Sequence, residues 1–263
     1  IGDLVYAIQG NVLTGQPVGD DAEAAILNTP GDLAEKVMAA MEAAHLAGGD
    51  GRCSCSPTQP DGCGAPPPNF THSAYCAYFL VSRPGDPKKD CDMNLGCGRG
   101  AFYMGLNIKN LGPNDPEPIG LLRQEYDAWR LAKQGVADSV QSLVIPQTKR
   151  VVPGAGLVRY DIELYDIEGV SLTVGGAMIS LEHQTDSAGL ASIQQVIDHQ
   201  DGSYSIDVMP GSTPGLDHFA FRVDDGLGGY QPLLWPPQTL LHETPAQAAP
   251  LLTAGLTPGL PQL

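Results

Sequence analysis

Six cysteines are the densest group of potentially reactive side chains, and they share one window of the chain: Cys53, Cys55, Cys63, Cys76, Cys91 and Cys97. An even number of cysteines in a short window indicates a local disulfide framework in an oxidising compartment. The alternative is zinc, but structural zinc sites favour cysteine pairs separated by about two to four residues. Cys53 and Cys55 are too close and Cys91 and Cys97 too far apart for that pattern. We therefore predict disulfides, and the sequence leaves their pairing open.

A second group of candidate residues is polar and lies beside glycines. Gln9 and Asn11 interrupt an apolar stretch on either side of one glycine, and Asp50 and Arg52 flank another. Amides beside a glycine either satisfy a turn or line a pocket. A carboxylate and a guanidinium at this spacing either lock a loop by a salt bridge or contact a ligand. The turn and the lock are the simpler interpretations, and the functional interpretation makes these four residues the walls of a pocket.

Metal and cofactor sites have little support in the sequence. Asp90, Asp92 and Asn94 have the spacing of a calcium loop, but the glycine and the glutamate that should follow are missing. Asp224 and Asp225 could bind a cation, although such a pair more often solvates a turn. The six histidines show no paired metal-ligand spacing. We expect no metal and no cofactor.

Charge and composition limit the partners. Thirty acidic residues against fourteen basic ones give the 263-residue chain a net charge of −16, which argues against nucleic acid and anionic membrane surfaces. No apolar run approaches the roughly 18 residues that span a bilayer, so we expect no membrane insertion. The chain opens with Ile1, and Asn69 begins a glycosylation sequon. We expect a processed, secreted protein located outside the cell or on its surface.

The front part of the chain reads as a mixture of helices and strands. An apolar run at residues 4–8 predicts an opening strand. Helices follow at 19–27 and from Thr29 and Pro30 to about 47, where Thr29 is a plausible N-cap. Apolar runs predict buried strands at 73–81 and 101–108, and the periodicity of 117–133 predicts an amphipathic helix.

The rear part has a different pattern. Residues 136–153 read as a linker with a possible short strand near 143–145. Beyond them apolar and polar residues alternate, as in Val158, Tyr160 and Ile162, and the same pattern recurs in three later segments. Strands with one apolar face, separated by turn residues, predict an antiparallel β-sandwich. A tail rich in Pro, Ala and Leu follows at 242–263.

Five motifs of the front part resemble one known family in their order and spacing: LVYAIQGNVLTG, TPGDLAEKVMAAMEAA, GGDGR, SAYCAYFLV and EPIGLLRQEYDAWR. Residues 3–135 look like the second half of a bacterial Ntn-hydrolase-like family known as domain of unknown function 1028. The resemblance implies a four-layer αββα fold with two stacked sheets. It also implies descent from amide hydrolases that use an N-terminal Thr, Ser or Cys as nucleophile and base, although members need not be catalytic.

The chain departs from that family in two ways. The cysteine-rich insert, residues 53–97, is longer than the usual link. The chain also begins where the family domain is about half complete, and Ile1 has no nucleophilic side chain. The ancestry suggests an amidohydrolase, but the chain offers no nucleophile, so its status as an enzyme is open.

The rear part, with its strand pairs and the FAFRV motif, resembles immunoglobulin-like modules of bacterial surface proteins. We therefore predict an α+β chain: a partial Ntn-hydrolase-like domain at 1–135, a linker at 136–153, an immunoglobulin-like sandwich at 154–241 and the tail. Two functions compete. One is a secreted Ntn-hydrolase-like protein whose nucleophile lies upstream, and the other is a non-catalytic structural or adhesive protein, such as a filament subunit. An incomplete sheet would be completed by an upstream segment or another copy, so we also expect a homo-oligomer.

Overall fold

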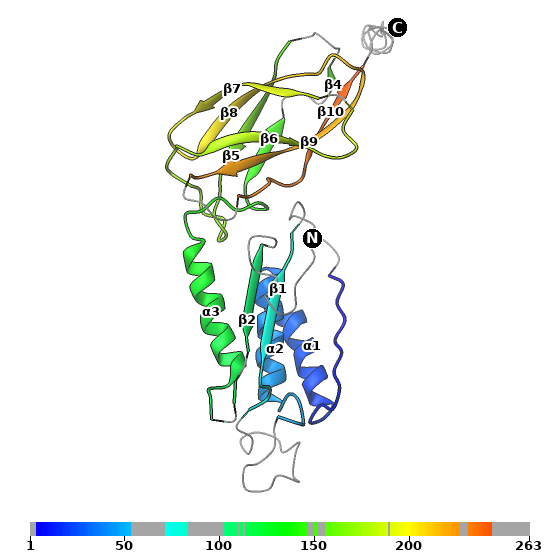
Figure 1. Cartoon of the computed structure of the whole chain (residues 1–263), viewed down its shortest axis with the longest axis vertical. Helices are drawn as coiled ribbons and strands as arrows, with labels where there is room; N and C mark the ends of the chain where they lie inside the picture. Colours follow the sequence, from blue (N-terminus) through cyan, green and yellow to red (C-terminus); the bar gives the residue numbers. More distant parts are fainter. Residues whose placement is uncertain are drawn as a thin grey trace, which may run out of the picture. The chain divides into compact units, whose positions relative to one another are not determined.

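The chain divides between Trp129 and Arg130 into two units in the computed structural model (Figure 1). The structure describes residues 4–53, 72–83, 103–109, 111–112, 114–146, 150–151, 156–188, 190–226 and 231–243. The described elements make a mixed α+β chain in which all strand pairs but one are antiparallel. This agrees with the coarse fold class predicted from the sequence.

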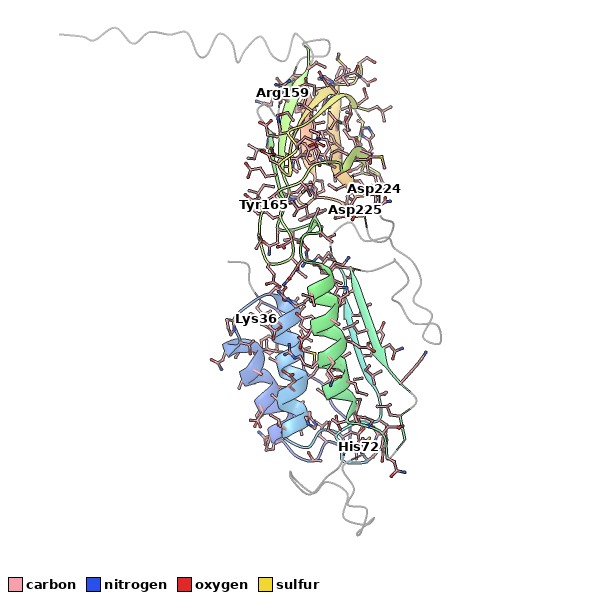
Figure 2. All side chains as sticks on the ribbon, turned by 90° about the vertical axis from the view of Figure 1, so that its left-hand side faces the viewer. Lys36, His72, Arg159, Tyr165, Asp224 and Asp225 are labelled. Carbon is pink, nitrogen blue, oxygen red and sulfur yellow. The ribbon has the colours of Figure 1, made fainter. Side chains whose placement is uncertain are left out.

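Unit 1 contains three helices and a two-stranded ribbon. The helices are α1 (Pro17–Asn28), α2 (Leu33–Leu46) and α3 (Pro118–Ala132). Strands β1 (Ala77–Val81) and β2 (Met104–Ile108) pair antiparallel. Helix α1 packs on α2, and the ribbon lies on the opposite side of α2 (Figures 1 and 2). The described residues of unit 1 hold this one ribbon, so the two stacked sheets of an Ntn-hydrolase-like fold stay a prediction.

The ends of α2 follow from local sequence. The Asp32 side chain accepts a hydrogen bond from the Glu35 backbone N–H at 2.9 Å, which satisfies one of the first free donors of the helix. The N-cap is therefore Asp32, and the predicted cap at Thr29 is wrong because the helix begins three residues later than its Pro30 suggests. Gly48 and Gly49 adopt φ of 108° and 61° and end the helix.

Aromatic side chains fill the space between the ribbon and α3. Phe79 of β1 contacts Tyr126 of α3 with ring centroids 5.6 Å apart, and Tyr126 stacks on Trp129. Tyr126 and Leu122 are fully buried. This is the apolar stripe that the sequence pattern of α3 predicts.

The first residues do not form the strand expected from their pattern. Residues 4–10 have no regular secondary structure and pair with no strand of the described chain, and only Leu13 makes a bridge, to Asp50. Val5 is 89 % exposed, and Leu4, Tyr6 and Ile8 are also exposed. The apolar pattern alone does not supply the neighbouring strand that a β-strand needs.

Unit 2 consists of two four-stranded sheets with a shared core. One sheet has the order β4-β10-β9-β6, built from Arg150–Val151, Gln238–His242, Gly215–Asp224 and Met178–His183. The other has the order β3-β5-β8-β7, built from Leu143–Pro146, Val158–Glu163, Ser203–Met209 and Ser192–Asp198. Strands β4 and β10 form the parallel pair. The segment predicted as a linker, 136–153, thus carries one strand of each sheet.

The inward faces of both sheets meet in one apolar cluster, so unit 2 is a β-sandwich. Tyr160 of β5 makes edge-to-face contacts with Phe219 and Phe221 of β9. Tyr160 alternates with more exposed residues along β5, as the period of two in the sequence predicts, whereas in β9 Ala220 between the two phenylalanines is also buried. An immunoglobulin-like relationship stays a prediction.

Candidate ligand-binding site

A cavity of about 270 Å³ opens in unit 1 between the first residues, α1, α2 and the start of α3. Apolar side chains form most of its lining, among them Ile8, Leu13, Val18, Met41 and Ile119. Its polar lining residues are Gln9, His45, Asp50 and Ser73. The segment before β1 also contributes, so five parts of the chain line one cavity.

Backbone hydrogen bonds hold these segments together. Thr14 N–H donates to the Gly49 carbonyl at 3.0 Å, and Gly51 N–H donates to the Val12 carbonyl at 2.7 Å. Asp50 N–H donates to the Ser73 carbonyl at 2.9 Å. The loop after α2 is thus the central strip of the wall, between the first residues and the segment before β1.

Gly49 is required where the loop after α2 meets the segment before β1. Its φ of +61° is unfavourable for residues with a side chain, and a Cβ there would lie 2.5 Å from the Ser73 carbonyl oxygen. The close approach of the two segments therefore depends on the absence of a side chain at position 49.

Asp50 and Arg52 form the loop lock that the sequence suggests. The Arg52 Nε and Nη2 atoms donate to the two Asp50 carboxylate oxygens at 2.9 and 2.6 Å, and the Arg52 backbone N–H donates to Oδ1 at 2.9 Å. The hydrogen bonds from Arg52 hold the pKa of the Asp50 carboxyl below its usual value, although burial opposes them. Asp50 is consequently an anion at the cavity wall.

Beside Asp50, three side chains from three segments meet. The Ser73 Oγ–H donates to Glu117 Oε1 at 2.7 Å, and the Ser73 backbone N–H donates to Oε2 at 2.9 Å. His45 Nδ1 lies 2.9 Å from Ser73 Oγ and 3.4 Å from Glu117 Oε1. Ser73 is buried, and Glu117 directly precedes α3.

This cluster contains the residue types of a hydrolytic triad, but its protons are arranged differently. A nucleophilic serine donates its proton to a histidine nitrogen that acts as base. Here the Ser73 proton points to Glu117, so the short contact with His45 Nδ1 requires that nitrogen to donate to Ser73. The cluster acts as a clamp that ties the end of α2 and the segment before β1 to the start of α3.

The four predicted pocket residues divide into two pairs. Gln9 and Asp50 line the cavity, whereas Asn11 and Arg52 do not. The sequence analysis missed His45, Ser73 and Glu117, which are separated by 28 and 44 residues. Their types were visible in the sequence, but no spacing rule connects residues of three different elements.

The remaining sequence predictions are tested only in part. Cys53 and Cys76 carry no disulfide in the structure, and the other four cysteines and Asn69 lie outside the described residues. Asp224 accepts hydrogen bonds from the Gly226 N–H at 2.8 Å and the Gln231 side chain at 2.9 Å, as in a solvated turn. Within the described ranges, no group of three or more His, Cys, Asp or Glu side chains could hold a metal ion.

Unit 2 has a cavity of its own, with a volume of about 310 Å³. Its lining is mainly glycine and apolar side chains, with Tyr204 and Asp225 as polar members. The Tyr204 hydroxyl already accepts a hydrogen bond from the Ala177 N–H at 3.1 Å. Fewer polar residues line this cavity than line the one in unit 1.

No helix in the described part of the chain is both long enough and apolar enough to cross a bilayer.

Comparison with solved structures gives weak similarities. An Escherichia coli adhesin, FdeC, is 21% identical over 41% of this chain and 32% of its own, with a TM-score of 0.34. The ZirS C-terminal domain is 10% identical over 39% of this chain and 66% of its own, with a TM-score of 0.28. The Lin-41 filamin domain is 12% identical over 41% of this chain and 96% of its own, with a TM-score of 0.29. This chain thus spans about a third of the adhesin.

No curated protein sequence matches the chain significantly. A family of unknown function, DUF1028, matches residues 3–58. The resemblance predicted over residues 3–135 is thereby supported for its first part. The match includes Gln9, His45 and Asp50 of the cavity and ends before Ser73 and Glu117.

Proposed function

We propose that this chain is a non-catalytic protein of the cell exterior that binds a small, mainly apolar ligand in the unit 1 cavity. The observation that carries the proposal is the cavity, with its apolar walls and its few polar residues Gln9, His45, Asp50 and Ser73. Sites for small molecules usually combine these two features, because apolar area supplies affinity and polar groups fix orientation. The anionic Asp50 favours a ligand with a hydrogen-bond donor or a positive charge at one end.

The hydrogen bonds of the clamp support binding over catalysis. Ser73 is buried and donates its proton to Glu117, so an attack by its oxygen needs a new base and a rearranged cluster. Asp50 is held by a bidentate contact with Arg52. These polar groups are positioned to shape a wall, and none of them is arranged as a nucleophile with its base.

A location outside the cell is supported by composition. The net charge of −16 disfavours nucleic acids and anionic membranes, and six cysteines lie within 45 residues of one another, between positions 53 and 97. In this proposal unit 2 is a supporting module and unit 1 binds the ligand. Binding of a ligand outside the cell would give the protein an adhesive role.

Ligand binding is tested by amide NMR on isotope-labelled protein. Benzamide and benzylamine serve as probes, because each combines an apolar ring with one polar end. We expect them to shift the amide signals of Gly49, Asp50, Ser73 and Ala74 and to leave the signals of unit 2 unchanged. Benzylamine should bind more tightly than benzamide if Asp50 attracts the positive end of the ligand.

Two substitutions of alanine by leucine make this test specific. Ala44→Leu places a larger side chain into the cavity wall and should weaken probe binding at least tenfold. Ala24→Leu adds the same atoms on an exposed position of α1 and should bind as the wild type does. Equal weakening in both variants, or shifts scattered over the chain, would contradict the proposal.

A second candidate function is amide hydrolysis with a nucleophile supplied by an upstream segment or another chain. Its support is that Gln9 and Asp50 contribute to the lining of one cavity. N-terminal sequencing and intact mass of the native protein should then reveal a companion chain that begins with Thr, Ser or Cys. Release of p-nitroaniline from N-acyl p-nitroanilides by the Ile1 chain alone would instead disprove the non-catalytic proposal.

A further inference from the structure

Two segments of the cavity wall each continue into a cysteine. The loop after α2 provides Asp50 and reaches Cys53, and the segment before β1 provides Ser73 and reaches Cys76. Asp50 N–H donates to the Ser73 carbonyl at 2.9 Å, which fixes the two segments side by side. Both cysteines lie three residues beyond this hydrogen-bonded pair.

The turn at the end of the first segment directs Cys53 toward the second. Cys53 N–H donates to the Asp50 carbonyl at 2.9 Å, so the chain folds back at this point. The Cys53 sulfur lies near the Tyr75 backbone N–H. Cys53 is therefore close to the residue that immediately precedes Cys76.

We infer that Cys53 and Cys76 are disulfide partners, and that their bond fastens the two wall segments of the unit 1 cavity to each other. The sequence left the pairing open, and the hydrogen bond between the two segments, with the turn at Cys53, points to Cys76 as the partner. The structure holds the two residues unbonded, with Cys53 half-buried and Cys76 exposed. A disulfide requires the two Cα atoms to lie within about 7 Å, so the proposed pairing needs the two segments to approach to that distance at Cys53 and Cys76.

The different surroundings of the two thiols give an order of reaction. Burial, followed by the charge of Asp50, raises the pKa of the Cys53 thiol and so disfavours its thiolate. The exposed Cys76 is thus the thiol that an oxidant reaches first. With glutathione disulfide as oxidant, the Cys76 thiolate attacks one sulfur and releases one glutathione thiolate.

The second step closes the bond. Cys53 loses its proton, and its thiolate attacks the Cys76 sulfur of the mixed disulfide and expels the second glutathione thiolate. Two cysteine thiols are oxidised, one glutathione disulfide is reduced to two thiols, and the two protons pass to the released glutathione. The pairing is independent of what the cavity binds.

Peptide mapping of the full chain under non-reducing conditions tests the pairing. The protein is oxidised with glutathione disulfide, alkylated with iodoacetamide and digested with chymotrypsin and an Asp-specific protease. Cleavage after Phe70 and Tyr75 and before Asp61 separates Cys76 from Cys63. We expect Cys76 in a linked peptide with the segment that contains Cys53.

Two serine variants distinguish Cys53 from its neighbour in the same peptide. Cys53→Ser should abolish the link and leave Cys76 alkylated, whereas Cys55→Ser should retain it. Oxidation should also raise the Tm of the wild type and of Cys55→Ser by several degrees, and this rise should be lost in Cys53→Ser. A link from Cys76 to any other cysteine, or full alkylation of Cys76 in the oxidised wild type, would disprove the pairing.

Discussion

In unit 2 a single carboxylate fixes the connection between two strands. Asp217 is fully buried in β9 and accepts hydrogen bonds from Ser187 Oγ, from His183 Nδ1 at 2.9 Å and from the Ala191 N–H at 2.5 Å. These donors all come from the end of β6 and the connection to β7. One buried carboxyl group with three donors therefore fixes that connection to β9.

The substitution Asp217→Asn should destabilise unit 2 by about 1–3 kcal/mol, because an amide in this place offers one acceptor fewer and brings an unmatched donor. Urea unfolding measures the loss. Asp186→Asn is the matched control, since Asp186 pairs with His218 but its side chain is 67% exposed. A loss as large in the control as in Asp217→Asn would contradict the assigned role of the buried carboxylate.

The ion pair between Arg159 and Asp207 makes the stability of the folded protein depend on pH. Hydrogen bonds from Arg159 Nε and Nη2, at 2.7 and 2.8 Å, lower the pKa of the Asp207 carboxyl in the folded protein. A lowered folded pKa means that the pair stabilises the fold above the unfolded value of about 4 and ceases to do so as pH falls further. The pair therefore contributes to folding stability at neutral pH, and this contribution is lost in acid.

We therefore expect the difference in unfolding free energy between wild type and Asp207→Asn to be largest near pH 7. It should shrink progressively below about pH 4, where the wild-type carboxyl becomes protonated as well. Urea unfolding from pH 7 to pH 2 measures this difference. A difference that stays constant over the whole range would show that Asp207 acts by shape and not by charge.

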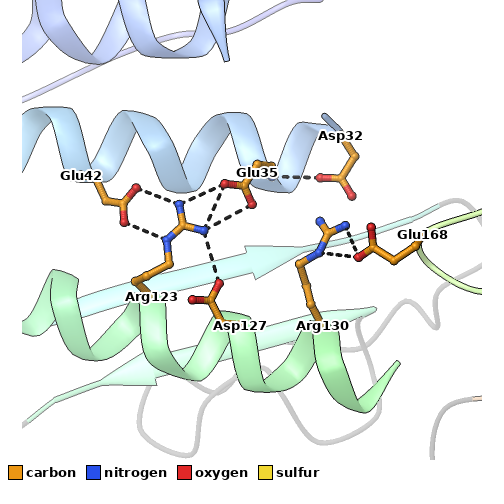
Figure 3. A network of polar contacts seen from close by, with 7 residues as sticks. All are labelled: Asp32, Glu35, Glu42, Arg123, Asp127, Arg130 and Glu168. Carbon is orange, nitrogen blue, oxygen red and sulfur yellow. Dashed lines mark hydrogen bonds and ion pairs between the residues drawn. The ribbon is translucent and has the colours of Figure 1, made fainter. Parts of the chain in front are cut away.

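At the scale of elements, Arg123 of α3 joins two helices of unit 1 (Figure 3). Its guanidinium contacts Glu42 at 2.8 Å and Glu35 at 3.1 Å, both on α2, and Asp127 on its own helix at 3.4 Å. The hydrogen bonds that Arg123 donates to Glu42 and Glu35 raise its pKa further above its already high value, although burial opposes them. One cation thus holds three carboxylates that would otherwise repel one another.

Arg123→Ala should destabilise unit 1 by about 1–3 kcal/mol, since it removes charge-assisted hydrogen bonds and leaves three neighbouring anions. Arg123→Lys should recover only part of the loss, because an ammonium cannot make the bidentate contacts. Thermal and urea unfolding measure both. Arg150→Ala, at a 57% exposed side chain paired with Glu243, is the control and should change stability by less than about 1 kcal/mol.

Gly49 gives an element-scale prediction of a different kind. Gly49→Ala should destabilise unit 1 by about 1–3 kcal/mol, because it adds strain at positive φ and a Cβ that collides with the Ser73 carbonyl. Gly120→Ala in α3 is the control. A Cβ there meets nothing within 4 Å, so the change should stabilise the helix by up to about 1 kcal/mol. Unfolding free energies of equal sign for the two variants would contradict this.

The sequence predicted elements better than it predicted their partners. Periods of two and of 3.6 are local properties, so the strands of the sandwich and the helix α3 were visible in them. The first residues were apolar enough for a strand, but nothing local shows whether an adjacent strand exists. The cavity was half predicted, because Gln9 and Asp50 lie beside glycines, whereas His45, Ser73 and Glu117 come together only through the packing of three segments.

At the scale of the whole molecule, charge and apolar exposure act against each other. The net charge of −16 keeps copies of the chain apart. Residues 4–13, however, expose Leu4, Val5, Ile8 and Val12 in one stretch. Contiguous apolar exposure of this kind is typical of association surfaces. The predicted homo-oligomer would use this stretch.

We expect self-association that increases with salt, because salt screens the repulsion and leaves the apolar contact intact. Size-exclusion chromatography with light scattering at low and high salt measures it. Val5→Lys should shift the protein toward the monomer, whereas Val174→Lys, at an exposed residue of unit 2, should not. A monomer at every salt and protein concentration would exclude the oligomer.

Crowding at position 49 has a consequence for evolution. Chain geometry alone disfavours every larger residue there, whatever molecule the neighbouring cavity binds. Among relatives, glycine should therefore persist at this site even where Ile8, Met41 and Ile119 vary. Invariance of this glycine would reflect the close approach of two backbone segments. Variation in the surrounding lining would instead reflect differences in the ligand that each relative binds.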